Sequence, residues 1–174
     1  MPPSDPDRPQ AAGRRRIVVS DAGPLISLGR LDLLPLLGEL FAEVQVPDIV
    51  MGECLARPDN LDAQRIRQGL EAGLLLICPA PPALLAGLQP GESAAITRAL
   101  EIGAALLMDE RAGRAHALAL GLTVTGTVGV LVHARRQGLI GPLAPLLAAL
   151  RASGQRLSDA LVRQALSDVG EAAD

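Results

Sequence analysis

The chain has 174 residues, 49% of them hydrophobic and 20% charged, which predicts one globular domain with a sizeable core. The formal net charge of −3 excludes a broadly basic nucleic-acid-binding surface, so a phosphate backbone would have to be attracted by a local arginine patch or a bound cation. All 16 basic residues are arginines, which excludes sites built on lysine, and Phe41, the only aromatic residue, cannot form a base-stacking platform.

The chain opens with a polar segment. Residues 1–15 are rich in proline and charge and lack the apolar stretch of a signal peptide, which predicts a disordered tail before a single domain at 16–170. The elements then expected, in chain order, are a buried strand at 16–20, a helix at 24–40 interrupted at Pro35, a strand at 41–46 and a helix at 48–56.

Strands and helices continue to alternate. The elements expected next are a helix at 62–73, a buried strand at 74–78, a helix at 90–103 that stops at Gly103, a strand at 104–108, a helix at 110–121, a strand at 122–126 and helices near 127–138, 142–152 and 158–168. This alternation predicts a three-layer α/β/α domain with a central parallel sheet of about five strands.

No apolar run is long enough to cross a membrane. Cys54 and Cys78 are far apart and form no metal-binding or disulfide motif. We therefore expect a protein of the reducing cytoplasm without a membrane partner.

Two buried strands end on a carboxylate. Asp21 follows "RIVVS", and Asp109 follows "AALLM". Ligands of parallel sheets bind at the carboxyl ends of the strands, where the strand order reverses, and both acids are expected at such ends.

Helical periodicity adds two further acids. Glu92 shares a helix face with Ile96 and Ala99, at the amino end of a buried stripe. Glu53 follows Val50 by three residues and leans towards the core side of its helix. Asp21, Glu53, Glu92 and Asp109 can therefore converge on one cleft.

Such a cluster is not expected to persist without neutralisation. Two carboxylates about 5 Å apart repel each other by roughly 3 kcal/mol at an effective dielectric constant of about 20. Either the acids take up protons or a cation binds them, and all-oxygen ligands favour Mg²⁺ or Mn²⁺. Such ions usually serve phosphoryl chemistry.

Each acid also has a structural interpretation. Asp21 and Asp109 can be N-caps of the helices that follow them, and Glu92 can complement a helix dipole. Glu53 can be a solvated helix residue. The order, the spacing and the strand-end placement together favour the functional interpretation.

The sequence resembles the PIN-domain family, which includes VapC-type toxins and related metal-dependent ribonucleases. The resemblance covers most of residues 16–166, in the segments "IVVSDAGPLISL", "VQVPDIVMGECL", "PGESAAITRALEIGAALLMDERAGRAHALALGLTVTGTVGVLVHARRQGLI" and "GQRLSDALVRQAL". It implies that Asp21, Glu53, Glu92 and Asp109 form the acidic site, with Asp21, Glu92 and Asp109 as ligands of Mg²⁺ or Mn²⁺. It also implies hydrolysis of single-stranded RNA or tRNA by metal-activated water, a homodimer, and an antitoxin partner.

The sequence departs from the commonest pattern of this family. The fourth strand usually ends in Thr-x-Asp with another acid beyond it, whereas here Met108 precedes Asp109 and the pair Glu110–Arg111 follows, so a second metal ion is not implied. Glu92 is one methylene longer than the usual Asp and is expected to contact the metal directly or through water.

Four further residues are candidates for substrate contacts. Ser20, beside Asp21, and Thr127, after the last strand, are hydroxyl helpers or simple turn caps. Arg111 and Arg114, close together on the helix that follows Asp109, can bind phosphate bidentately or can be ordinary solvated arginines.

Other classes of protein remain as alternatives. The main one is a PIN scaffold that binds nucleic acid or protein with little or no nuclease activity. A receiver domain lacks its lysine here, a haloacid-type phosphatase lacks its second Asp, and "SDAGPL" is not a dinucleotide-binding motif.

Overall fold

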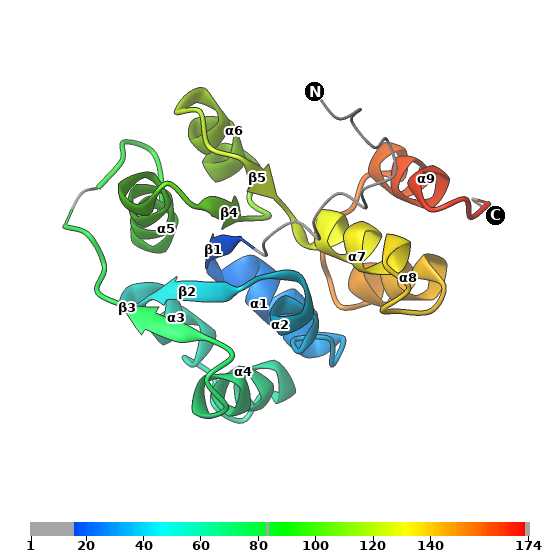
Figure 1. The fold of residues 1–174 in the computed structure, drawn as a ribbon, viewed down its shortest axis with the longest axis horizontal. Coiled ribbons are helices and arrows are strands. Elements are labelled where there is room, and N and C mark those ends of the chain that lie inside the picture. The colour runs from blue at the N-terminus through cyan, green and yellow to red at the C-terminus, as the bar shows by residue number, and fades with distance from the viewer. Residues whose placement is uncertain (1–15, 83, 173–174) are drawn as a thin grey trace, which may run out of the picture.

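The computed structural model describes residues 16–82 and 84–172, so the predicted disordered tail lies outside the described residues. Its centre is a five-stranded parallel sheet in the order β3-β2-β1-β4-β5 (Figure 1). The strands are β1 (Ile17–Ser20), β2 (Glu43–Pro47), β3 (Leu76–Cys78), β4 (Ala105–Leu107) and β5 (Val124–Thr125). The predicted parallel sheet is confirmed.

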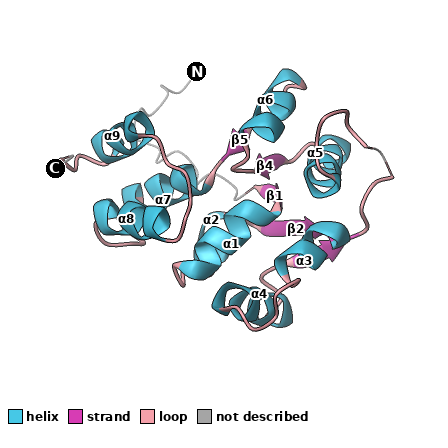
Figure 2. Cartoon of the chain, turned by 180° about the vertical axis from the view of Figure 1, so that it is seen from behind, coloured by secondary structure: helices cyan, strands magenta, loops and turns pink. Residues whose placement is uncertain are grey.

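Helices connect the strands and cover both faces of the sheet (Figure 2). They are α1 (Ala22–Arg30), α2 (Leu36–Leu40), α3 (Asp48–Cys54), α4 (Leu61–Glu71), α5 (Pro90–Ile102), α6 (Arg111–Ala119), α7 (Thr127–Arg136), α8 (Leu143–Ala152) and α9 (Asp159–Asp168). Parallel strands need such crossover connections, and the predicted three-layer α/β/α architecture is confirmed.

The two central strands are buried on both faces. Val18 and Leu107 pack into the larger core, which is built with α1, α2, α3, α4, α7, α8 and α9. Their neighbours Val19 and Leu106 point the other way, into a smaller core with α5 and α6. This alternation follows from the pleat of a strand, and packing on both faces positions the carboxyl ends of β1 and β4.

Two features differ from the prediction. The strand at 74–78 is only partly buried: Leu75 and Cys78 are buried, but β3 lies at the edge of the sheet, where Leu76 and Ile77 remain 42% and 50% exposed. The helix expected at 24–40 ends at Arg30, earlier than the predicted interruption at Pro35. Asp32, with a φ of 57°, lies in the break and cannot continue a right-handed helix.

No described helix is both long and apolar enough to pass through a bilayer.

Candidate active site

Asp21 and Asp109 follow adjacent strands, β1 and β4. The strand order reverses at this point, because β1 pairs with β2 on one side and with β4 on the other. The backbone N–H of Asp21 donates to the carbonyl of Leu107 at 2.9 Å, and neighbouring strands are about 4.8 Å apart. The two acids therefore border the crevice in which open parallel sheets bind ligands.

Glu53 and Glu92 reach the same edge from α3 and α5, which contact each other. The Glu53 carboxylate lies against the backbone of Gly91, where a Cβ atom would be only 2.5 Å from Glu53 Oε1. Glu92 is the next residue of α5. A glycine at 91 therefore allows two helices to present acids side by side.

The electrostatics show that the four acids share one environment. Asp21 is only 7% exposed. Burial, and then the negative charges of Glu53, Glu92 and Asp109, raise the pKa of Asp21 to about 7, against a hydrogen bond from the Ala22 backbone that lowers it. Burial and the charge of Glu92 also raise the pKa of Glu53.

No cationic side chain of the described segments forms an ion pair with any of these four acids. The described chain therefore offers these charges hydrogen-bond donors, but no arginine paired directly with a carboxylate.

The Asp109 carboxylate is held by three donors. The backbone N–H of Thr127 donates to Oδ1 at 2.7 Å, and the Thr127 hydroxyl donates to Oδ2 at 2.6 Å. The side-chain amide of Gln155 also donates to Oδ2, at 3.2 Å. Asp109 therefore binds the first turn of α7, and Glu110 rather than Asp109 is the N-cap residue of α6.

Asp21 and Glu92, which the sequence also allows as helix-stabilising residues, differ in whether they stabilise a helix start. Asp21 occupies the N-cap position of α1, but its side chain forms no capping hydrogen bond. Glu92 does stabilise its own helix start, because Oε2 accepts the backbone N–H of Gln89 at 2.9 Å. Its other oxygen, Oε1, accepts no hydrogen bond within the described residues.

The two predicted hydroxyl helpers lie in different surroundings. The Ser20 hydroxyl is fully buried and donates to the backbone carbonyl of Asp21 at 2.9 Å. It therefore shapes the chain after β1, whereas Thr127 contacts a site carboxylate directly.

The two candidate arginines also differ. Arg114 donates from Nη1 to the carbonyl of Met108 at 2.8 Å, which fixes its guanidinium beside the residue before Asp109. The Arg111 side chain is exposed and forms no hydrogen bond or ion pair with the rest of the described chain. A groove of about 820 Å³ runs beside Asp109, and its walls include Arg114, Gln155 and Arg156.

Comparison with known proteins identifies the family. The DUF3368 family model, described as a PIN domain, matches residues 17–171. The chain belongs to the PIN-domain family. PIN domains are generally nucleases that use divalent metal ions.

A solved structure agrees with this assignment at the level of the fold. A PilT N-terminus domain protein from the hyperthermophilic archaeon Sulfolobus solfataricus P2 is 18% identical, with a TM-score of 0.51 over 67% of this chain and 92% of that chain. No curated protein matches this PIN domain.

The donor set of this PIN domain fits a hard divalent cation. The four acids offer carboxylate oxygens, and burial, followed by the charges of the other three acids, raises the pKa of Asp21. Within residues 16–82 and 84–172, however, no three acidic, His or Cys side chains surround a single point as metal ligands. Binding of one ion by three of these acids would therefore require their side chains to move closer together.

Gln155 is the site residue that sequence reasoning missed. It lies 46 residues after Asp109, in the connection between α8 and α9. A glutamine in a loop between two helices carries no local signal of function, and only the tertiary structure brings it to the acids.

Proposed function

We propose that this PIN domain is a Mg²⁺- or Mn²⁺-dependent endoribonuclease that hydrolyses phosphodiester bonds of single-stranded RNA or tRNA. The observation that carries the proposal is the buried Asp21 beside Asp109 at the switch point of the sheet, with its pKa raised to about 7 by burial and by the charges of three other acids. Binding of a divalent cation would neutralise the charges of such a site.

Each residue has a defined part in this proposal. Asp21 and Asp109 would hold the cation directly, and Glu92 directly or through water. When bound, the cation supplies an activated water and stabilises charge on the phosphate. Glu53, which reaches the site over Gly91, positions the attacking water or completes the metal shell.

The biological setting is a further part of the proposal. The family resemblance favours the toxin component of a type II toxin–antitoxin pair, with a homodimer and an antitoxin as partners. Light scattering of the purified protein, with and without a co-expressed neighbouring gene product, tests both partners. A monomer under both conditions contradicts this part alone.

RNA cleavage by Asp109→Asn tests the nuclease. Mn²⁺ binding and cleavage of a mixed single-stranded RNA and tRNA pool are compared with those of wild type. Loss of one metal-ligand charge is expected to reduce cleavage at least about 100-fold, because the cation and its water are no longer held in place.

Asp168→Asn is the matched control, because Asp168 is a partly exposed acid of α9 in an ordinary ion pair with Arg136. It should cleave as wild type does. Equal cleavage by wild type and Asp109→Asn would defeat the catalytic assignment.

The second candidate is a PIN scaffold that binds nucleic acid or protein without cleaving. It is favoured by one observation: among the described residues, no three His, Cys, Asp or Glu side chains lie close enough together to bind a single metal ion. Metal binding without cleavage of any RNA by wild type would support this second function.

A further inference from the structure

The connection between α8 and α9 contributes a side chain to the acidic site. Gln155 donates from Nε2 to Asp109 Oδ2 at 3.2 Å, and its Oε1 accepts the hydroxyl proton of Ser27 at 3.0 Å. Asp109 offers only acceptors, which sets the orientation of the amide. A hydrogen-bonded chain thus leads from α1 through Gln155 to the end of β4.

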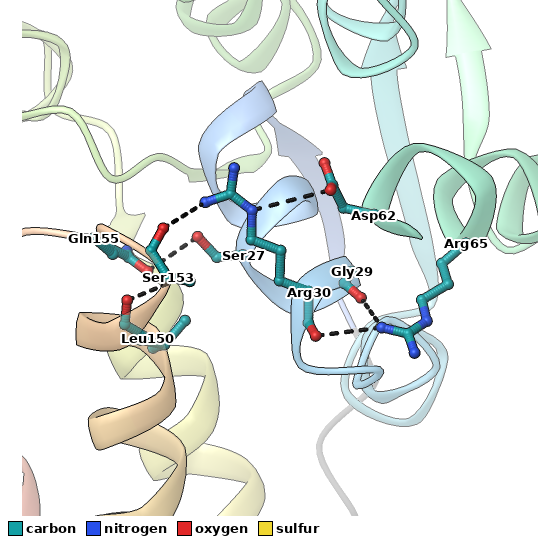
Figure 3. A network of polar contacts seen from close by, with 8 residues as sticks. All are labelled: Ser27, Gly29, Arg30, Asp62, Arg65, Leu150, Ser153 and Gln155. Atoms are coloured by element: carbon teal, nitrogen blue, oxygen red, sulfur yellow. Dashed lines mark hydrogen bonds and ion pairs between the residues drawn. The ribbon is translucent and has the colours of Figure 1, made fainter. Parts of the chain in front are cut away.

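The backbone just before Gln155 is also held by hydrogen bonds, which Ser153 forms with α1 and with the end of α8 (Figure 3). Arg30 of α1 donates from Nη1 to the carbonyl of Ser153 at 3.2 Å, and its Nε lies 4.0 Å from the mostly buried Asp62 of α4. The Ser153 hydroxyl closes the end of α8 by donating to the carbonyl of Leu150 at 2.8 Å. The amide of Gln155 therefore projects from an anchored loop.

The hydrogen bonds of Asp109 leave it little free acceptor capacity. An ionised carboxylate has about four lone-pair positions, two on each oxygen. Thr127 and Gln155 together occupy both positions on Oδ2, and Thr127 occupies one on Oδ1. A single position on Oδ1 remains for a ligand.

We propose that Gln155 is a positioning residue that, with Thr127, holds Asp109 as a one-oxygen ligand through Oδ1. The inference rests on the proposed function, since it describes how one acid of that site meets its cation. It also makes the α8–α9 pair, distant in sequence from the acids, a working part of the site. Partners of this kind around a ligand carboxylate typically change metal affinity by about 10- to 100-fold.

Gln155→Met tests the proposal, because methionine keeps the length of the side chain and removes its hydrogen bonds. Mn²⁺ affinity, measured by titration calorimetry, is expected to fall at least about 10-fold. The matched control is Gln164→Met, since Gln164 of α9 also donates to an aspartate, Asp168, at 2.9 Å but lies elsewhere. An affinity of Gln155→Met equal to or above that of wild type overturns the proposal.

A second measurement needs no metal. The Thr127 amide, bonded to Asp109 Oδ1, should shift in the ¹H–¹⁵N spectrum and exchange faster in Gln155→Met, and stay unchanged in Gln164→Met. If wild type binds no Mn²⁺ but the Thr127 amide responds, the proposed function and the metal-ligand part of this inference fail, and Gln155 is shown only to orient the Asp109 carboxylate. An unresponsive Thr127 amide overturns the positioning role.

If Gln155→Met fails to fold, Ser27→Ala replaces it. This variant removes only the donor at the far end of the chain. It is expected to change both measurements in the same direction by a smaller amount, and no change in either overturns the proposal.

Discussion

At the scale of single residues, the candidate site depends on two glycines as well as on its acids. Gly91 allows the Glu53 carboxylate to lie against the start of α5, and Gly126 leaves space beside Asp109 Oδ1, which would be 2.9 Å from a Cβ atom at that position. Neither glycine has a positive φ, so their conformational freedom is not the reason for their presence. Space for carboxylates is the role that the structure gives them.

Gly91→Ala is predicted to weaken cleavage without weakening the fold. The added methyl group meets the end of the flexible Glu53 side chain, which can move away, and alanine is the better helix former by about 1 kcal/mol. Thermal unfolding should therefore show an unchanged or higher Tm, while cleavage falls.

Gly52→Ala is the control for this prediction. Gly52 adjoins Glu53 in α3, and a Cβ atom there would meet nothing within 4 Å. Its cleavage should match that of wild type. Full activity in Gly91→Ala would show that the position of Glu53 is unimportant. Loss of activity in Gly52→Ala would show that any added methyl group near Glu53 is harmful, so the effect would not be specific to position 91.

At the scale of elements, the start of α8 is stabilised by a residue far along the chain. The residue before α8 is Pro142, whose side chain cannot cap the helix. The Glu171 carboxylate caps the helix instead, because it accepts hydrogen bonds from the backbone N–H groups of Leu143 at 2.8 Å and Ala144 at 3.1 Å. It also forms an ion pair with Arg135 of α7 at 2.9 Å. These contacts join α7, α8 and the segment after α9, and so support the loop that carries Gln155.

Glu171→Gln is predicted to lower the Tm at neutral pH. The hydrogen bond from Leu143, and then those from Arg135 and Ala144, lower the pKa of Glu171. The stability from this charge is therefore present above pH 4.5, the ordinary pKa, and is lost as the pH falls through the lowered folded-state pKa. The Tm difference between wild type and variant should shrink in acid.

Glu101→Gln should leave the Tm almost unchanged at every pH, because the Glu101 carboxylate is half exposed and pairs at 3.5 Å with the guanidinium of Arg98, one helical turn away. A pH-independent Tm difference between wild type and Glu171→Gln would contradict the charge-based explanation.

At the scale of the whole molecule, the fold brings four acidic side chains together where β1, β4, α3 and α5 meet. The acids lie on or next to four elements, and those elements pack into two hydrophobic cores. The protein therefore tolerates a buried acid, Asp21, at its candidate site. This is the ordinary trade of stability for function.

The free energy of unfolding of the metal-free protein is predicted to be lowered by Asp21 as the pH rises from about 4 to about 7. In this window the folded state keeps a proton on Asp21 that the unfolded chain has released, because the pKa is raised from 3.8 to about 7. The loss is at most about 4 kcal/mol. Urea unfolding in EDTA, compared between wild type and Asp21→Asn, measures it.

The difference between the two proteins, rather than either curve alone, isolates Asp21 from the other acids. Asp21→Asn should become the more stable protein as the pH approaches 7, and Mn²⁺ should raise the stability of wild type only. Parallel curves for the two proteins from pH 4 to pH 8 would mean that Asp21 is not perturbed.

Much of the site could be predicted from the sequence. Strands that end on Asp21 and Asp109 are visible as local runs, and parallel strands have their carboxyl ends at one edge, so the meeting of these two acids follows from the fold class. The helical period similarly places Glu92 above the buried Ile96 and Ala99. The contact of Glu53 with Gly91 does not follow, because it depends on how two helices pack.

The sequence by itself therefore determined the alternation of strands and helices, the parallel sheet and the acids at two strand ends, because these depend on periodicity within short segments. The tertiary structure alone decided that β3 is an exposed edge, that Asp109 binds α7 rather than its own helix, and that Gln155 joins the site. Each of these depends on which distant segments become neighbours. That choice is made by the packing of whole elements, and no local pattern records it.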